Sequence, residues 1–240
     1  MYLPTSENSV SVVNDDVRQS MQSSDANSSG STGAFPLKGI FAALPDFGLA
    51  AMYLITWLHP YAFGQNMVAY LLLLMLMEFI NVHSAGFMGF MLISDTSRTK
   101  KGLGIVGFGL FYTLFVLGFA LGFGVWWPVW AFWIMTGNRL LGLLIGQAPQ
   151  GREKSFVMVS WALSVLFYLA FVFVTSIAPV PAFGLTEEVI RAQGLTGGGL
   201  WIDEPQRVIA FGFLYFTAVA ISEVLADVVM ARSAKTNPAP

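Results

Sequence analysis

The sequence predicts an all-α fold, a polytopic membrane bundle of six transmembrane helices with both termini in the cytoplasm. Of the 240 residues, 55% are hydrophobic and 11% are charged, whereas charged residues make up about a quarter of a typical soluble domain. Five apolar segments reach the roughly 20 residues that a helix needs to cross a bilayer. Basic residues are concentrated in alternate loops between these segments. Together these observations define the fold class.

Residues 1–37 differ in composition from the rest of the chain. They include the run SSDANSSGSTG, which is rich in Ser, Gly and Asn and cannot bury enough apolar surface to offset the entropy of ordering. They also lack the basic start and apolar core of a secretory signal. We therefore expect a disordered polar tail ahead of the membrane domain.

The transmembrane domain is predicted to occupy residues 38–231. Its expected spans are residues 45–58, 66–94, 102–123, 127–146, 156–177 and 208–231. The first is shorter than a bilayer requires, unless residues 38–44 continue it through Pro45 or it lies partly in the interface. Asp46, directly after Pro45, is expected to be the acidic residue at the N-terminus of this helix.

Charges in the loops orient the six spans. The loops after the second, fourth and sixth spans are basic, with Arg98, Lys100, Lys101, Arg152, Lys154, Arg232 and Lys235. The intervening loops are uncharged or acidic. The positive-inside rule therefore places both termini in the cytoplasm, including a short tail of residues 232–240. We expect the bacterial inner membrane as the location, with the lipid bilayer as the first partner.

The outer loop of residues 178–207 is the only sizeable segment between spans. Glu187 and Glu188 favour the positive N-terminus of a short helix over residues 186–193, and Gly194 suits its end. Two interpretations stay open for this loop. It is either a lid or docking surface, or a connector that lies on the lipid headgroups.

Glycines spaced four residues apart occur in two spans, as Gly118 and Gly122 and as Gly142 and Gly146. Such pairs form a groove that lets another helix approach closely. The simpler interpretation is that the third and fourth spans pack on each other through them. The alternative is a face for a second copy of the chain or for another membrane protein.

Six polar residues at membrane depth form the candidate site. They are Glu78, Asn81 and His83 in the second span, Asn138 and Arg139 in the fourth, and Glu223 in the sixth. A charge in hydrocarbon costs a few kcal/mol, so such residues usually have a partner or a function. Asp227 is close enough to the cytoplasmic end to reach water and is left out of the site.

Depth along the helices predicts two pairs among these residues. At about 1.5 Å per residue, Glu78 and Arg139 both lie about 18 Å from the outer boundary, and His83 and Glu223 lie at about 25 and 24 Å. We expect an ion pair in the first case and a contact in the second. Either the groups form a polar pathway, or Glu78 and Arg139 clamp the bundle and His83 bonds to a backbone carbonyl.

The angular positions of the polar residues around the helix axis predict that the second span lies at the centre of the bundle. Glu78 and His83 lie about 140° apart around the helix axis, whereas Asn81 lies about 60° from Glu78. A helix with polar groups on so much of its circumference is expected to have protein on most sides.

Several function classes lack support in the sequence. The chain has no cysteine, which excludes thiolate metal sites and a Cys nucleophile. His59 and His83 lie about 25 Å apart in depth, too far to ligate one haem. No phosphate loop, dinucleotide fingerprint or HExxH motif occurs, and a net charge of −2 offers no footprint for nucleic acid. No catalytic residue, cofactor or metal is predicted.

Two functional hypotheses agree best with the sequence. The first is a small transporter or ion- or proton-permeation protein with an intramembrane polar site. The second is a non-catalytic accessory subunit or assembly factor of a membrane complex. An enzyme that acts on lipid would need a nucleophile or metal that the sequence does not supply.

Overall fold

The computed structural model describes residues 37–145, 152–195 and 197–236. The predicted tail up to residue 36, Gly146 of the second glycine pair and the last four residues of the chain lie outside the described residues. Throughout the described ranges all regular structure is helical, which confirms the predicted fold class.

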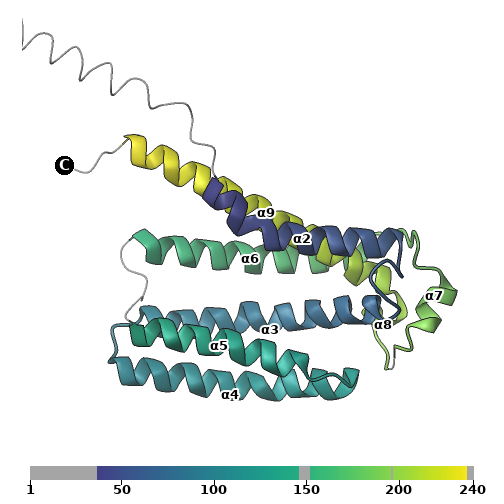
Figure 1. Cartoon of the computed structure of the whole chain (residues 1–240), viewed down its shortest axis with the longest axis horizontal. Helices are drawn as coiled ribbons and strands as arrows, with labels where there is room; N and C mark the ends of the chain where they lie inside the picture. The colour runs from purple at the N-terminus through teal and green to yellow at the C-terminus, as the bar shows by residue number, and fades with distance from the viewer. Residues whose placement is uncertain (1–36, 146–151, 196, 237–240) are drawn as a thin grey trace, which may run out of the picture. The chain divides into compact units, whose positions relative to one another are not determined.

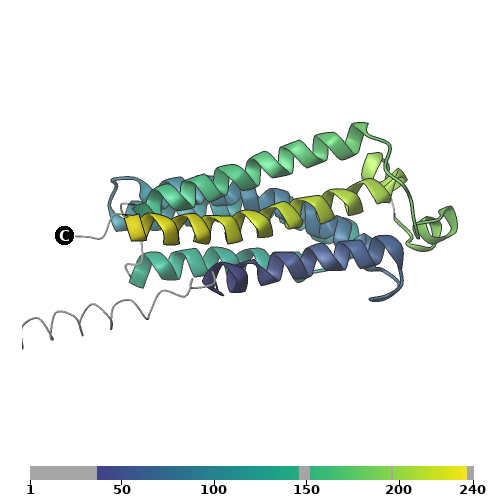
Figure 2. The same cartoon turned by 90° about the horizontal axis from the view of Figure 1, so that it is seen from above.

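Six helices are long and apolar enough to cross a membrane. They are α2 (Leu37–Leu58), α3 (Met67–Ile93), α4 (Arg98–Phe123), α5 (Trp127–Ile145), α6 (Arg152–Ile177) and α9 (Pro205–Thr236). Two short helices, α7 (Glu187–Ala192) and α8 (Leu200–Asp203), lie between α6 and α9. Figures 1 and 2 show the long helices running side by side, with α7 beyond one end of them. The cytoplasmic placement of the termini stays a prediction.

The first span is longer than the predicted residues 45–58, because α2 begins at Leu37 and continues through Pro45. Asp46 therefore lies about 14 Å into the helix, and the expectation that it begins the helix was wrong. Asp227 of α9 takes that role instead. Its Oδ2 accepts a hydrogen bond of 3.0 Å from the Gly39 backbone N–H, one of the first-turn donors that a helix leaves unpaired.

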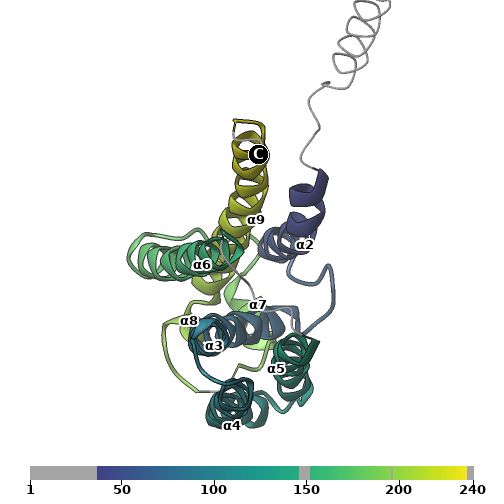
Figure 3. The same ribbon diagram turned by 90° about the vertical axis from the view of Figure 1, so that its left-hand side faces the viewer.

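The helix α3 occupies the centre of the bundle, as predicted. Viewed along the bundle, α2, α9 and α6 lie on one side of α3, and α4 and α5 lie on the other (Figure 3). One hydrophobic core joins α3 to α2, α6 and α9, with Tyr53, Leu71 and Phe211 among its buried residues. A second joins α3 to α4 and α5 around Leu73 and Phe132.

The two ends of the bundle differ in charge. At the end with the segment between α3 and α4, Lys101 and Lys154 donate from Nζ to the backbone carbonyls of Leu92 and Ile93, at 2.7 and 3.1 Å. Basic side chains at a helix C-terminus satisfy carbonyls that have no partner within the helix. We call this the basic end and the opposite one the α7 end.

Glycines allow close helix contacts on both sides of α3, at different positions from those predicted. On the α4 side, a Cβ on Gly104 would collide with the Met91 side chain of α3, and one on Gly109 would lie 3.3 Å from the Thr136 side chain of α5. A Cβ on Gly212 of α9 would collide with the Tyr53 ring of α2, and one on Gly86 of α3 with the Trp161 indole of α6. A Cβ on Gly118, Gly122 or Gly142 would meet open space. The prediction that α4 and α5 pack through those glycines was therefore wrong.

The segment between α6 and α9 is attached to the helix ends. The predicted short helix is present as α7, and Thr186 caps it by accepting from the Val189 N–H. Trp57 of α2 donates to the Pro181 carbonyl at 2.9 Å and accepts from the Gly184 N–H at 3.1 Å. These bonds fix the start of the loop against α2.

Arg207 fixes the other end of this loop. Its Nη1 donates to the carbonyls of Thr175, Ser176 and Ala178 at the end of α6, at 2.8 to 3.1 Å. Its Nε pairs with Glu204 at 2.7 Å. One guanidinium thus satisfies the C-terminal carbonyls of α6 and joins α6 to the start of α9.

Candidate intramembrane carboxylate site

Four aromatic side chains donate hydrogen bonds to one face of α3. Three bonds end on backbone carbonyls: Tyr53 Oη to Leu71 at 2.7 Å, Tyr168 Oη to Met75 at 3.1 Å and Trp161 Nε1 to Val82 at 2.8 Å. The fourth runs from Tyr215 Oη to Glu78 Oε1 at 2.7 Å. The acceptors at positions 71, 75, 78 and 82 follow the spacing of one helix face. We call this set the aromatic ladder.

The aromatic ladder has a simple physical cause. The rings of Tyr53, Tyr168 and Tyr215 are at most 4% exposed and fill the core between α2, α3, α6 and α9. A buried phenol still needs a partner for its O–H, and water is absent at membrane depth. A helix carbonyl has a second lone pair to offer. The bonds therefore fix the rotation of α3 and direct Glu78 toward α9.

Asp46 of α2 lies at the level of Glu78. The two helices are antiparallel, and Tyr53 of α2 bonds to Leu71 of α3. Seven residues toward the basic end, about 10 Å along each axis, lead from Tyr53 to Asp46 and from Leu71 to Glu78. In agreement, Asp46 interacts electrostatically with the Glu78 carboxyl group.

Glu223 and Asp227 of α9 continue this series of acids toward the basic end. Glu223 lies two turns beyond Tyr215, interacts electrostatically with Asp46, and has a buried Oε2 with no hydrogen-bond partner among the described residues. Asp227 follows one turn later and bonds to Gly39. Glu78, Asp46, Glu223 and Asp227 thus line the region between α2, α3 and α9, and we call them the carboxylate series.

No basic side chain that the structure describes forms an ion pair with the carboxylate series. The ion pairs within the described ranges are Arg191 with Glu187 and Arg207 with Glu204, both between α6 and the start of α9. Like-charged carboxylates without a cation repel each other, and the repulsion is relieved when one of them binds a proton. The carboxylate series therefore has the chemistry of a proton-binding site.

The predicted ion pair between Glu78 and Arg139 is absent. Arg139 of α5 is half-buried, and its Nη1 approaches the Met88 sulfur of α3 at 3.2 Å. Met88 lies ten residues, about 15 Å, beyond Glu78 toward the basic end. The depth count assumed that α3 and α5 begin at the same level. In the structure, the first residue of α5 lies further from the α7 end than the first residue of α3 does, so Arg139 lies deeper than Glu78 (Figure 1).

The predicted contact between His83 and Glu223 is also absent. The His83 Nδ1 lies 2.8 Å from the carbonyl oxygen of Phe79, and its ring packs on the Phe79 ring, which contacts Tyr168 of α6. Glu223 instead interacts with Asp46 of α2. The bond between Tyr215 and Glu78 also sets Glu223 about three residues deeper than His83, so the equal depth that the sequence predicted was wrong. The alternative of a backbone-bonded His83 agrees with this geometry.

The two predicted asparagines have different surroundings. Asn81 lies beside the Glu78 carboxyl group, on the face that the helical spacing predicts, and its Oδ1 is buried without a partner among the described residues. Asn138 is exposed on the outside of α5. Of the six predicted residues, the structure brings Glu78 and Asn81 together, with Glu223 nearby on α9.

Sequence reasoning missed Asp46 and the tyrosines of the aromatic ladder. Asp46 was assigned to a helix terminus because Pro45 precedes it, so its depth was not counted. Tyr53, Tyr168 and Tyr215 gave no distinct signal, since tyrosine is common in apolar cores. The apolar composition of residues 39–44 is the signal that could have extended the helix.

These features define the class of protein: a multi-pass membrane helix bundle with hydrogen-bonded carboxyl groups inside its spans. Within the described residues, no group of three or more His, Asp or Glu side chains could hold a metal ion. Comparison with protein-family models, curated proteins and solved structures gives no match to this chain.

Proposed function

We propose that the protein is a small transporter or permeation protein that moves protons, with Glu78 and Asp46 as the central proton-binding groups. The observation that carries the proposal is the placement of both carboxyl groups at one level within the spans, without a cationic partner among the described side chains. Intramembrane acids of this kind are typical of proton relays.

The carboxylate series supplies a route from this centre to one side only. Glu223 and Asp227 continue it to the basic end, which the loop charges predict to be cytoplasmic. Toward the α7 end, Glu78 is closed off by fully buried side chains such as Tyr53, Leu71 and Phe211. Movement of a proton across the membrane therefore requires this apolar layer to open or rearrange.

The aromatic ladder supports the site in two ways. The Tyr215 hydroxyl holds the Glu78 carboxyl group in one position, so its proton affinity depends on a fixed geometry. The carbonyl bonds of Tyr53 and Tyr168 fix α3 at the same depth. Residues that hold an ionisable group in place are part of how proteins set its chemistry.

Proton flux into vesicles tests the proposal. The full chain is reconstituted in phosphatidylcholine vesicles that contain a pH-sensitive dye, and a potassium diffusion potential drives the flux. We expect flux with the natural chain and none above empty vesicles with Glu78→Gln. Glu188→Gln is the matched control, because Glu188 is exposed on α7 far from the spans.

Thermal unfolding of each variant in detergent separates function from folding. An E78Q protein that folds normally but carries no protons supports the proposal. Flux that persists in E78Q, or a natural chain no more active than empty vesicles, would contradict it.

A second candidate function is that of a non-catalytic accessory subunit. The observation that favours it is the exposure of Gly118 and Gly122 on α4, which no other part of the described chain contacts closely. Native mass spectrometry after mild extraction distinguishes the candidates. A stoichiometric partner that is lost in Gly118→Leu would favour the accessory role, and a self-sufficient homo-oligomer or monomer would favour the transporter.

A further inference from the structure

A cavity separate from the carboxylate series lies at the α7 end. It has a volume of 390 Å³, within the range of small-molecule sites. The start of α3 and the end of α4 form one side of it, and residues 193–195, Gly197 and Ile202 form the other. Its lining includes Gln193, Asn66 and Tyr70 as polar residues and Phe123, Leu195 and Ile202 as apolar ones.

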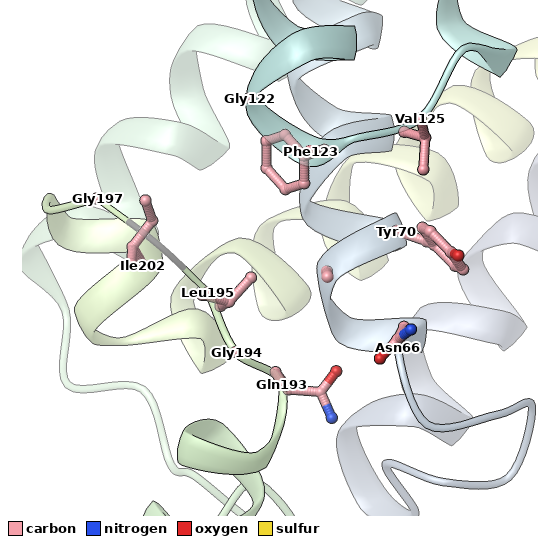
Figure 4. Close-up of a pocket in the computed structure, with 11 residues that line it drawn as sticks. Asn66, Tyr70, Gly122, Phe123, Val125, Gln193, Gly194, Leu195, Gly197 and Ile202 are labelled. Carbon is pink, nitrogen blue, oxygen red and sulfur yellow. The ribbon is translucent and has the colours of Figure 1, made fainter.

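Gln193 is the unusual residue of this cavity. Its side chain is 7% exposed, and both carboxamide atoms, Oε1 and Nε2, are buried with no hydrogen-bond partner among the described residues. Figure 4 shows this carboxamide directed toward the part of the cavity lined by Asn66 and Tyr70. An amide buried without partners costs about 1–3 kcal/mol, so a buried donor and acceptor of this kind indicate that a bound molecule supplies the partners.

The neighbouring residues Asn66 and Tyr70 are available to the same molecule. Asn66 is the N-cap residue of α3, yet its side chain makes no capping hydrogen bond and is exposed. Tyr70, one turn later, is 42% exposed and contributes its ring to the lining, with its hydroxyl directed away from Gln193 (Figure 4). Carboxamides donate and accept, as hydroxyl groups do.

The lining determines the charge of the ligand. No Asp, Glu, Lys, Arg or His lines the cavity in the described part of the chain. A charged ligand would lose its hydration without gaining an opposite charge. Phe123 and Tyr70 add aromatic surface for the C–H face of a ring-shaped ligand.

We infer that this cavity binds a neutral polyhydroxyl group through the carboxamides of Gln193 and Asn66, with the Tyr70 and Phe123 rings against its apolar face. The position at the end of the spans, where the lipid headgroups lie, allows two sources for this group. It is either a free polyol or sugar, or the sugar headgroup of a glycolipid. The inference does not depend on proton transport.

Binding to nanodiscs that contain the full chain tests the inference and separates the two sources. One arm titrates glycerol, myo-inositol and methyl β-D-glucoside into phosphatidylcholine nanodiscs by calorimetry. The other compares phosphatidylcholine nanodiscs with and without monoglucosyl diacylglycerol, and measures co-purified glycolipid by mass spectrometry. Purification avoids sugar-based detergents, which would compete for the cavity.

Gln193→Leu is the informative variant, and Gln65→Leu is its matched control. Gln65 is exposed, lies next to Asn66 in sequence and does not line the cavity. We expect Q193L to weaken binding by about tenfold or more, because two hydrogen bonds are lost, and Q65L to leave it unchanged. Without ligand, Q193L should be at least as stable as the natural chain, because an unpaired buried amide is removed.

Binding in either arm that Q193L weakens supports the inference and identifies the source. The absence of binding in both arms overturns it, and so does binding of equal strength in Q193L. A large loss of thermal stability in ligand-free Q193L would also overturn it, since the amide would then have a partner within the chain.

Discussion

The two faces of α3 are built in different ways. On the side of α2, α6 and α9, hydrogen bonds from Tyr53, Tyr168, Tyr215 and Trp161 reach α3 across the helix interfaces. On the side of α4 and α5, the core is formed by apolar and aromatic contacts, such as those around Leu73 and Phe132. The first face therefore has directional contacts along the core, whereas the second has them only toward the basic end, from Lys101 to the Leu92 carbonyl and from Arg139 to the Met88 sulfur.

This difference indicates where the chemistry lies. Directional bonds fix one rotation and one depth of a helix, which is what an ionisable group such as Glu78 needs for a defined environment. Packing in lipid can tolerate small shifts, because lipid chains are as apolar as the side chains they replace. We therefore regard the α2, α6 and α9 side as the functional half and the α4 and α5 side as its support.

The largest expected effect comes from adding a side chain to a close contact in the functional half. Gly212→Val places methyl groups where the buried Tyr53 ring lies, so we expect a loss of about 3 kcal/mol or a failure to fold. Gly122→Val on α4 meets open space and should change stability little. Thermal unfolding in detergent compares the two. Equal effects would contradict the close contact between Gly212 and the Tyr53 ring.

A smaller effect is expected when the bond to Glu78 is removed. Tyr215→Phe keeps the ring in the core but leaves the carboxyl group without its donor, so we expect a loss of about 1–3 kcal/mol in stability. Proton flux in vesicles should fall as well. Tyr53→Phe is the matched control, because the Leu71 carbonyl keeps its helical bond. It should cost about 1 kcal/mol and reduce flux less than Tyr215→Phe does, because Tyr53 does not bond to Glu78 itself.

The smallest effect is expected for Arg139→Met on the supporting half. Arg139 contacts the Met88 sulfur and forms no ion pair with Glu78, so the variant should change stability by less than about 1 kcal/mol. Removing one partner of a buried ion pair would cost about 3–5 kcal/mol. A loss of that size in R139M unfolding would restore the pair that the sequence predicted.

The fold class could be predicted from the sequence, but the contacts between side chains of different helices could not. Length and hydropathy depend only on composition along the chain, so the apolar segments could be predicted. The central place of α3 followed from the spread of its polar residues around the helix axis. The two predicted contacts are absent because they were inferred from depth alone. A contact also depends on which helices are neighbours and on which way each side chain faces. Arg139 does not reach Glu78 because α3 and α5 are offset along their axes. His83 does not contact Glu223, because its ring packs on Phe79 and bonds to the Phe79 carbonyl.

The candidate site shows the same limit. Glu78 and Asn81 were found because they are polar residues in an apolar segment. Asp46 was not, because a proline was taken as a helix boundary, whereas α2 continues through it. A proline costs a helix one hydrogen bond and some straightness, and neighbouring helices can offset that loss within a membrane.

A double-mutant cycle of proton flux on Glu78 and Asp46 tests the central claim most directly. Asp95→Asn is the control, since Asp95 is exposed between α3 and α4. If the two acids form one proton-binding site, Asp46→Asn and Glu78→Gln each remove flux, and the double variant loses no more than either single one. Natural flux in the D46N variant would contradict the account, because the carboxyl group that only the structure places at the depth of Glu78 would then have no part in the site.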